Sequence, residues 1–331
     1  MSQQDLKNLI DRFQGLKIAV WGDFILDQYL YGLTRRISRE APVLIISYEK
    51  EEYAPGGAGN SVLNLSALGA EPLPIGVIGD DEAGEKIVSF FKQRNIPVSS
   101  LIRLKNFKTP IKTRILAGEE NTRHQQVLRI DREAIVPDKE NLLRRLYEHL
   151  QKAVTKCQAI LISDYNYMTV KTRLFTSLIQ ACRQHRLPVT LDSRFRLLSF
   201  RGVTIATPNE PEAEAALHME INKDSKLLIQ AGQLLLRRLA SQAVLITRGS
   251  KGMVLFERNQ KPFFIPIYGS TDIVDVTGAG DTVISVITLA LASGSNFRQA
   301  ALLANYAGGL VVMKKGTATV SPQELKNAIS S

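Results

Sequence analysis

The chain has few of the residues that mark several common protein classes. Its 331 residues include two cysteines, Cys157 and Cys182, four histidines and one tryptophan. Two cysteines cannot build a disulfide framework, so we expect both in the core of a reduced protein. The longest uncharged run, 282–297, contains Ser, Thr and Gly and is shorter than the roughly 20 apolar residues of a membrane span. No secretory signal precedes the first expected strand. We therefore expect a cytoplasmic protein without a membrane segment.

Acidic residues are outnumbered by basic ones. The chain has 42 Lys and Arg against 32 Asp and Glu, which gives a formal charge of +10. Such an excess suits an anionic small substrate as well as a nucleic acid. However, the basic residues are scattered through segments such as 144–152 and 171–186, without the interleaved aromatic residues of a single-strand binder. We expect no nucleic-acid partner.

The chain also lacks internal repeats, low-complexity tracts and Pro/Gly/Ser linkers. Short apolar runs alternate with helical patterns such as 57–68 and 81–93, which predicts an α/β fold. A mostly parallel central sheet with helices on both faces follows from this alternation. We expect one domain over residues 1–331. The expected strands of the sheet are 17–22, 73–79, 159–163, 188–192, 203–207 and 243–247.

Two segments interrupt the alternation. Residues 42–54 form one extended pattern, and residues 111–131 read as two strands joined by a polar loop. Neither segment is followed at once by a helix. Together they predict a small inserted antiparallel sheet that acts as a lid. Sheet edges of this kind are usually covered in natural proteins, so we expect a homodimer.

The segment DVTGAGD (275–281) carries the clearest chemical signal. Gly278, Ala279 and Gly280 leave backbone N–H groups uncovered at the start of an apolar helix, which predicts an anion site. Asp281 would lie beside the bound anion. A carboxylate there makes sense as the base that takes a proton from a nucleophile attacking a phosphoryl group.

Other interpretations of this segment remain open on its sequence alone. Asp275 or Thr277 could cap a core helix, with the glycines allowing close packing. The chain has no G-x-x-x-x-G-K-[ST] loop and no G-x-G-x-x-G after a strand. If the protein uses ATP, DVTGAGD is therefore the best candidate for the phosphate site.

DVTGAGD resembles the C-terminal signature of the ribokinase-like (PfkB-type) carbohydrate kinases. The resemblance extends over roughly residues 15–322 and implies a ribokinase-like fold and ATP-dependent phosphorylation of a sugar hydroxyl. Further segments resemble motifs of this family in the same order. They are GDFILD (22–27), PGGAGN (55–60), TPNEPEA (207–213), TRGSKG (247–252) and AGGLVVMKKGT (307–317).

Five residues of the N-terminal motifs are candidates for binding the sugar. Asp23 and Asp27 are expected at the carboxyl end of the first strand, where their carboxylates would accept hydrogen bonds from hydroxyl groups. Gly56 and Gly57 would let the backbone approach the ligand, and Asn60 would bind a hydroxyl. Asp27 could instead be a solvated loop residue.

The resemblance also implies metal ions near the phosphates. Asn209 and Glu212 would organise Mg²⁺ and the phosphates of ATP, mostly through water. The same N-x-x-E pattern could equally mark a helix start with an acidic first turn. The segments around Asp275 and Thr277 resemble a loop of the family that binds a monovalent cation, and K⁺ is the candidate ion here.

Four further residues are assigned to ATP by the same resemblance. Thr247, Gly249 and Gly252 follow an expected strand, where a tight turn would approach the phosphates or the ribose. Asn305 lies on the penultimate helix, where the family shapes the adenine pocket.

Within the family, the N-terminal half is most similar to the D-glycero-β-D-manno-heptose 7-phosphate kinases. Arg36, together with Arg35 and Arg39, would bind a phosphate already present on the substrate. A solvated basic turn is the alternative interpretation. The segments that carry this similarity are GDFILDQYLYG (22–32), RISREAPV (36–43), PGGAGN (55–60), VLRIDRE (127–133), SDYNYMTV (163–170) and DVTGAGDTVI (275–284).

The sequence departs from the heptose kinases in two places. They usually have Gly-Lys-Gly where this chain has NYM (166–168), and Asp-Pro-Lys where it has DSR (192–194). A kinase for another sugar or sugar phosphate therefore stays open, as does a non-catalytic sugar- or nucleotide-binding regulator. Asp281 argues against the regulator, because a pure binder gains nothing from a carboxylate at an anion site. The histidines form no H-x-G-H element, so we expect any adenylyltransferase partner to be a separate protein.

Overall fold

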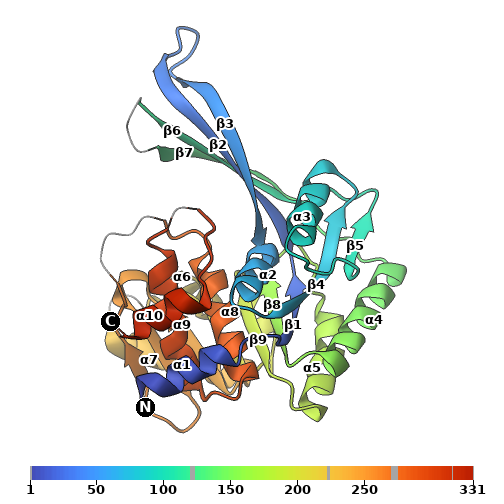
Figure 1. Ribbon diagram of the computed structural model, residues 1–331, viewed down its shortest axis with the longest axis vertical. Coiled ribbons are helices and arrows are strands. Elements are labelled where there is room, and N and C mark those ends of the chain that lie inside the picture. The colour runs from blue at the N-terminus through green and yellow to red at the C-terminus, as the bar shows by residue number, and fades with distance from the viewer. Residues whose placement is uncertain (1, 120–123, 222–223, 270–274, 315, 331) are drawn as a thin grey trace.

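The structure is a computed structural model of the chain (Figure 1). It describes residues 2–119, 124–221, 224–269, 275–314 and 316–330. Within these residues the elements form one large sheet, called the main sheet, and a smaller one that projects from it, called the arm.

The main sheet confirms the predicted α/β architecture. Neighbouring strands are parallel from β11 to β5, and β12 is antiparallel to both of its neighbours. In the described part of the chain the sheet has nine strands. In spatial order they are β13 (Phe263–Ile265), β12 (Met253–Glu257), β11 (Ala243–Thr247), β10 (Ile205–Ala206), β9 (Val189–Ser193), β8 (Ala159–Asp164), β1 (Lys17–Gly22), β4 (Glu71–Gly79) and β5 (Leu101–Leu104).

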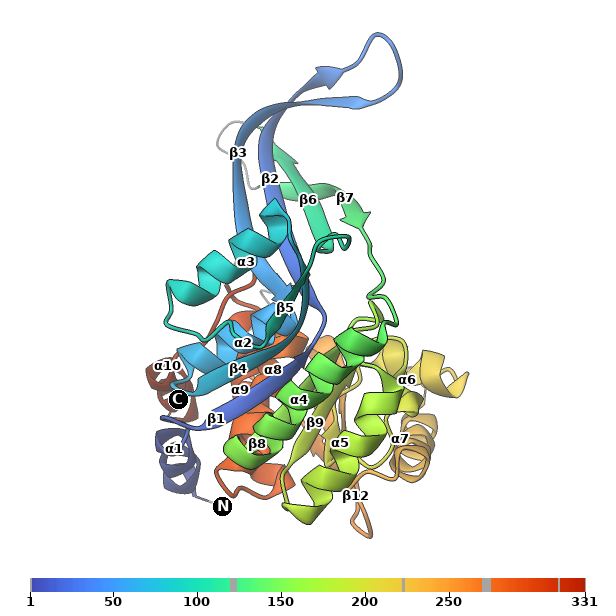
Figure 2. The same ribbon diagram turned by 90° about the vertical axis from the view of Figure 1, so that its right-hand side faces the viewer.

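Helices cover both faces of the main sheet (Figure 2). Along β1, Ile18 and Val20 pack into one apolar core, whereas Ala19 and Trp21 pack into the other. The first core is closed by α1 (Gln3–Asp11), α2 (Ala58–Ala67), α3 (Glu82–Lys92), α8 (Ala279–Ala292), α9 (Phe297–Val311) and α10 (Pro322–Ser330). The second is closed by α4 (Glu140–Lys156), α5 (Thr172–Gln184), α6 (Glu210–Leu217) and α7 (Ser225–Leu239).

The arm contains four strands and differs from the prediction in two respects. Its order is β3–β2–β6–β7, and β2 pairs with β6 in parallel, so the sheet is mixed and not antiparallel throughout. The sequence analysis also missed one strand of the arm, 24–37, because it placed Asp23 and Asp27 at the end of the first strand. The strands are β2 (Phe24–Ile37), β3 (Leu44–Gly57), β6 (Ile111–Gly118) and β7 (Gln125–Arg132).

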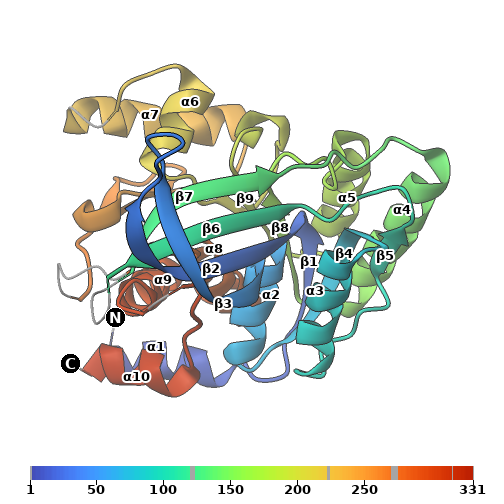
Figure 3. The same ribbon diagram turned by 90° about the horizontal axis from the view of Figure 1, so that it is seen from above.

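The arm extends away from the main sheet, and Figure 3 shows it lying across the top of the molecule. Its inner end begins directly after β1, where Asp23 separates β1 from β2. The opposite side of the molecule carries both ends of the chain, where α1 and α10 pack together and Asp11 pairs with Lys326.

The long uncharged segment 282–297 contributes to the apolar helix α8. The α8 residues from Asp281 to Ala290 are buried, many of them in the first core. No helix in the described ranges is long and apolar enough to cross a membrane.

Candidate active site

A cavity of about 430 Å³ lies between the main sheet and the arm. It opens at the carboxyl ends of β8, β9 and β11, the edge at which open α/β sheets usually bind ligands. Its walls combine residues of both sheets with the start of α8. The lining residues are Ile25, Asp27, Gly57, Lys112, Arg114, Gln126, Arg129, Asp164, Tyr165, Asp192, Arg194, Thr207, Asn209, Glu212, Thr247, Val276, Thr277, Gly278, Gly280, Asp281 and Thr317.

Asp281 lies in the first turn of α8 and is only 4% exposed. Its Oδ2 accepts a hydrogen bond from Asn60 Nδ2 at 2.8 Å, and its Oδ1 accepts one from the Tyr165 hydroxyl at 3.2 Å. Burial raises the pKa of Asp281 to about 6, although both hydrogen bonds act in the opposite direction. At neutral pH the group is therefore mostly a carboxylate whose pKa is close to that of an efficient general base.

The backbone before Asp281 has the form expected of an anion site. Gly278 is the N-cap of α8 with φ of +79°, a left-handed conformation that favours glycine. A Cβ at Gly280 would meet no atom within 4 Å, so this residue faces open space. The Ala279 N–H donates to the Val276 carbonyl at 3.3 Å. Within the described chain, the N–H groups of Gly280 and Asp281 donate to no protein acceptor and remain available to a ligand.

Asn60 is placed differently from the expectation. It is fully buried and absent from the cavity wall, because α2 packs directly against α8. Its amide Nδ2 donates to Asp281, and its Oδ1 accepts a hydrogen bond from Asn64 Nδ2 at 3.2 Å. In this structure Asn60 therefore holds the carboxylate of Asp281.

The two glycines before α2 are required by close contacts. Gly57 lines the cavity with φ of +57°, and a Cβ there would lie 2.6 Å from the Asp23 carbonyl oxygen. A Cβ at Gly56 would lie 2.3 Å from Asp27 Oδ2. Gly56 therefore makes room for Asp27, whereas Gly57 itself faces the ligand space.

The acidic pair of the first motif is divided between two roles. Asp27 lines the cavity and pairs with Arg114 at 2.6 Å, so it is not a solvated loop residue. Asp23 lies outside the wall and is 1% exposed. Its carboxylate accepts hydrogen bonds from the backbone N–H groups of Tyr165, Tyr167 and Thr169 at 2.8–3.1 Å. Asp23 thus organises the loop after β8.

That loop contains two residues in left-handed conformations. Asn166 and Met168 both have φ of +67°. Glycine adopts this conformation without strain. L-residues pay an energetic penalty for it, which is smallest for residues such as Asn. These are the two positions at which the heptose kinases usually have glycine. The sequence departs from their pattern, but the backbone keeps the conformation that glycine favours.

The predicted nucleotide residues lie partly on the cavity wall and partly outside it. Asn209 and Glu212 form a capping box at the start of α6, with reciprocal hydrogen bonds of 2.8 and 2.9 Å, and both line the wall with Thr247. Gly249 and Gly252 lie in the turn after β11 and are absent from the wall.

Asn305 also lies outside the wall. It is buried on α9, where its Nδ2 donates to the Pro266 carbonyl at 2.9 Å.

Two carboxylates face the cavity beside the predicted nucleotide residues. Burial raises the pKa of both Asp192 and Glu212, and the charge of Glu212 raises that of Asp192 further. A cation between or beside them would relieve this repulsion. Among the described residues, no three His, Cys, Asp or Glu side chains are placed to hold a metal directly. The two carboxylates therefore fit Mg²⁺, which keeps several waters.

The predicted site for a monovalent cation is described only in part. Asp275 Oδ1 accepts a hydrogen bond from the Thr277 N–H at 2.9 Å, and Oδ2 accepts one from the Gly316 N–H at 3.1 Å. Oδ1 therefore holds the turn within the signature, and Oδ2 ties the signature to the closing segment. Residues 270–274, on which the prediction also falls, lie outside the described residues.

The positive charges of the cavity come mostly from the arm, which sequence reasoning missed. Lys112 and Arg114 on β6 and Arg129 on β7 line the wall, together with Arg194 after β9. Arg36 is absent from the wall, because it lies nine residues beyond Asp27 along β2, about 30 Å at the rise of a strand. The parallel pairing of β2 with β6 places Lys112 beside Asp27 instead.

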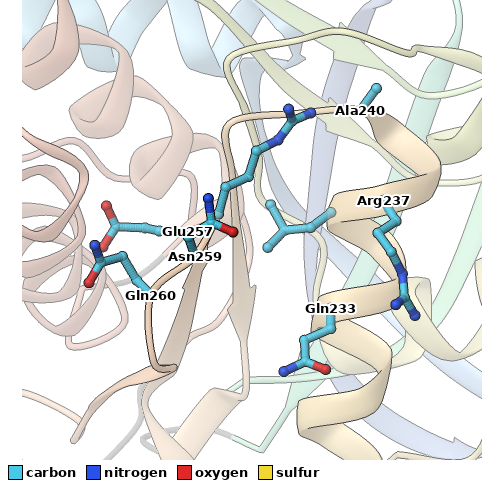
Figure 4. Close-up of a pocket in the computed structure, with 8 residues that line it drawn as sticks. Gln233, Arg237, Ala240, Glu257, Asn259 and Gln260 are labelled. Carbon is cyan, nitrogen blue, oxygen red and sulfur yellow. The ribbon is translucent and has the colours of Figure 1, made fainter.

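A second hollow of about 640 Å³ lies between α7 and β12, where Gln233, Arg237 and Glu257 line it (Figure 4). Glu257 pairs with Ala243, the first residue of β11, so this hollow lies at the amino edge of the parallel strands. The cavity with Asp281 is therefore the better candidate for catalysis.

Comparison with known families agrees with this geometry. Residues 16–324 match the pfkB family carbohydrate kinases, and the chain belongs to this family. It is a carbohydrate kinase by family and fold.

Among individual proteins, the chain is similar to several named Bifunctional protein HldE. Identity is 39% with that of Geobacter sulfurreducens, covering 99% of this chain and 66% of the relative. It is 39% with that of Haemophilus influenzae, covering 96% and 64%. It is 36% with that of Pelobacter propionicus, covering 100% and 66%. The chain thus spans about two thirds of the length of these curated relatives.

Solved structures show the same fold at low sequence identity. Arabidopsis thaliana ribokinase, complexed with ribose and ATP, matches with a TM-score of 0.74 and 18% identity over 96% of this chain and 100% of its own. Escherichia coli phosphofructokinase-2, in complex with potassium, matches with a TM-score of 0.75 and 18% identity over 96% and 99%. The ribokinase-like fold is therefore confirmed.

Proposed function

We propose that the chain transfers the γ-phosphoryl group of ATP to the anomeric hydroxyl of D-glycero-β-D-manno-heptose 7-phosphate. The products are the 1,7-bisphosphate and ADP. The observation that carries the kinase chemistry is the buried Asp281 carboxylate at the uncovered start of α8, on the wall of the central cavity. The heptose-kinase motifs of the N-terminal half and the similarity to HldE proteins support this sugar.

Asp281 acts as the general base in this proposal. Its carboxylate takes the proton of the sugar hydroxyl while the hydroxyl oxygen forms a bond to the γ-phosphorus, and the bond from that phosphorus to the β–γ bridging oxygen breaks. The N–H groups of Gly280 and Asp281, with Gly278 shaping the turn, stabilise the negative charge of the transferred group. The hydrogen bond from Asn60 keeps the carboxylate beside these groups.

Metal ions enter this proposal through the residues that would hold them. Asp192 and Glu212 would hold Mg²⁺ through water, and Mg²⁺ would neutralise the charge of the ATP phosphates. Asp275 and Thr277 belong to the segment proposed for K⁺, in line with the potassium complex of phosphofructokinase-2.

ATP is assigned to the side of the cavity formed by Asn209 and Thr247. The turn with Gly249 and Gly252 lies beyond it, and Asn305 supports the strand end that closes the adenine side.

The phosphate of the substrate is assigned to the arm. Lys112, Arg114 and Arg129 line the cavity from β6 and β7 of the arm, whereas Asn209 and Thr247 line it from α6 and β11. Charge-assisted hydrogen bonds of this kind contribute roughly 1.5–3 kcal/mol each, about tenfold to a hundredfold in binding. These arm residues take the place of Arg36 as the proposed phosphate contacts.

The first experiment offers ATP and Mg²⁺ with a panel of sugars and sugar phosphates and identifies the product by ³¹P NMR. We expect the heptose 7-phosphate to give the highest kcat/KM and the unphosphorylated heptose a much lower one. Equal use of both would remove the phosphate contact from the proposal. A higher kcat/KM for another sugar phosphate would replace the heptose and keep the chemistry.

The second experiment tests the base. Asp281→Asn should lower kcat by about 10² to 10⁴ while the Kd for ATP, measured by calorimetry, stays near that of the wild type. Turnover close to wild type would overturn the role of Asp281.

We further propose that residues 1–331 form one domain and that a second copy covers the arm. Ile37, Val43 and Tyr48, near the tip of the arm, are 56–67% exposed. Apolar side chains gathered at a sheet edge are a common sign of association. Sedimentation equilibrium should give twice the monomer mass, and Ile37→Lys with Tyr48→Lys should return it to the monomer. A monomeric wild-type chain would contradict the proposal.

A further inference from the structure

Tyr165 contacts three separate parts of the molecule. Its hydroxyl donates to Asp281 Oδ1 at 3.2 Å, and its backbone N–H donates to Asp23 at 2.8 Å. The ring faces the Nζ of Lys112 on β6, which lies 4.8 Å from the ring centre. Tyr165 therefore joins the loop after β8, the start of α8 and the arm.

The position of the ring is set by the backbone. Asp23 also accepts the N–H groups of Tyr167 and Thr169, so a buried carboxylate holds three alternate residues of this loop. The left-handed residues Asn166 and Met168 lie between them. A loop held in this way presents the Tyr165 hydroxyl to Asp281 in one orientation.

The two oxygens of Asp281 are held from different sides. The Asn60 Nδ2 donates a hydrogen bond to Oδ2 at 2.8 Å. Oδ1 has the Tyr165 hydroxyl at 3.2 Å and the Ser61 hydroxyl at 3.5 Å, the limit of a hydrogen bond. Without the Tyr165 hydroxyl, Oδ1 would keep only the weaker contact. The orientation of the carboxylate toward the cavity then depends mainly on Asn60.

We propose that Tyr165 is a positioning residue for phosphoryl transfer, which fixes the Asp281 carboxylate through its hydroxyl while its ring packs against Lys112 of the arm. This inference rests on the proposed role of Asp281 as the base. Nothing in the motifs DVTGAGD or PGGAGN assigns such a role, because Tyr165 comes from neither.

The hydroxyl also affects the charge of the base. A donor to a carboxylate stabilises the ionised form, so the Tyr165 hydrogen bond lowers the pKa of Asp281. The other charged groups that act on Asp281 are Asp27 from β2, which raises its pKa, and Lys112 from β6, which lowers it. Asp192 on β9 repels it as well. Removal of the hydroxyl alone should therefore raise the pKa of the base.

Tyr165→Phe is the decisive variant, because it removes the hydroxyl and leaves the ring against Lys112. We expect the acidic limb of the kcat–pH profile to move upward by about one pH unit, since a hydrogen bond to a charged group contributes on that order. At pH 6 the turnover should fall about fivefold, with the KM for ATP unchanged. Thermal melting confirms that the variant folds.

Tyr167→Phe is the matched control. It removes a hydroxyl from the same loop, two residues away, and leaves the backbone contact with Asp23 intact. Its pH profile should coincide with that of the wild type. A Tyr165→Phe profile that coincides with this control would overturn the inference.

Two further outcomes separate this inference from the proposed function. If Asp281→Asn keeps its turnover, the proposed function itself fails, and the inference fails with it. If Asp281→Asn is inactive and Tyr165→Phe only raises the KM for the sugar, with an unmoved acidic limb, Tyr165 is a substrate contact. The inference then fails while the proposed function stands.

Discussion

The main sheet and the arm bring opposite charges to the same cavity. The main sheet and its helices supply Asp192, Glu212 and Asp281, whereas the arm supplies Lys112 and Arg129. Two residues depart from this division, because Asp27 lies on the arm and Arg194 follows β9. This division suits a reaction between two anions. The carboxylates of the main sheet need a metal ion before an anion can bind beside them, whereas the lysine and arginine side chains of the arm can bind an anion directly.

The largest effect is expected at the junction of the two regions, where Asp23 separates β1 from β2. Asp23→Ala would leave three buried backbone N–H groups of the loop after β8 without an acceptor. An unsatisfied buried donor costs about 1–3 kcal/mol, so we expect a loss of several kcal/mol in the free energy of unfolding. Urea denaturation measures it. Asp80→Ala, at a half-exposed carboxylate, should change it little, and similar losses in both variants would contradict this role.

The buried carboxylate of Asp281 should lower the free energy of unfolding at neutral pH. The pKa of Asp281 is about 6 in the folded chain against an ordinary 3.8, so the folded state favours the proton. This group therefore stabilises the folded state fully below pH 4, and that contribution is lost as the pH rises through 6. Across this range the free energy of unfolding falls by about 3 kcal/mol. Asp281→Asn should therefore melt higher than the wild type at pH 8 but not at pH 4. An equal difference at both pH values would contradict the raised pKa.

The basic side can be tested with two arginines of the arm. Arg129→Ala should raise the KM for the sugar phosphate about tenfold, since Arg129 lines the cavity. Arg36→Ala, on the same sheet but outside the cavity wall, should leave it unchanged. Steady-state kinetics with saturating ATP measure both. If Arg36→Ala has the larger effect, the phosphate is bound by the outer arm and not by the cavity wall.

The smallest effect concerns the left-handed backbone of the loop that holds Tyr165. Met168→Gly should be more stable than Met168→Ala by about 0.5–1 kcal/mol, because glycine adopts a φ of +67° without strain. In an ordinary helix or strand the order of these two variants would be reversed. Thermal melting of the pair is the measurement, and the usual order would mean that the loop relaxes out of the left-handed region.

The sequence predicted the central strands of the main sheet and three strands of the arm, but it missed β5, β12 and β13 at the edges of the main sheet and β2 in the arm. Strands buried on both faces, such as 17–22 and 243–247, are continuous apolar runs and stand out in any sequence. The strand 24–37 has three charged residues, Asp27 near its start and Arg35 and Arg36 at its exposed outer end. The sequence analysis placed these residues after the end of the first strand and Arg36 near the substrate, whereas the structure has Arg36 near the outer end of β2 and outside the cavity wall.

The same contrast holds for the candidate site. Asp281 and Gly278 were found because their chemistry lies within one short motif. Lys112 and Arg114 reach the cavity only because β2 pairs in parallel with β6, and no local sequence pattern predicts this pairing. Tyr165 had a usable signal, because it follows an expected strand at the carboxyl edge of the sheet, where ligand sites form.

The packing of α1 against α10 has a consequence for the order of the chain. Asp11 pairs with Lys326, Figures 1 and 3 both show α1 and α10 side by side, and Figure 1 shows them away from the arm. Adjacent ends make a protein suitable for circular permutation. A chain that begins in the turn between β12 and β13, with a short linker joining the present ends, should keep every strand in place. The linear order of the motifs would change, and their meeting around the cavity would not.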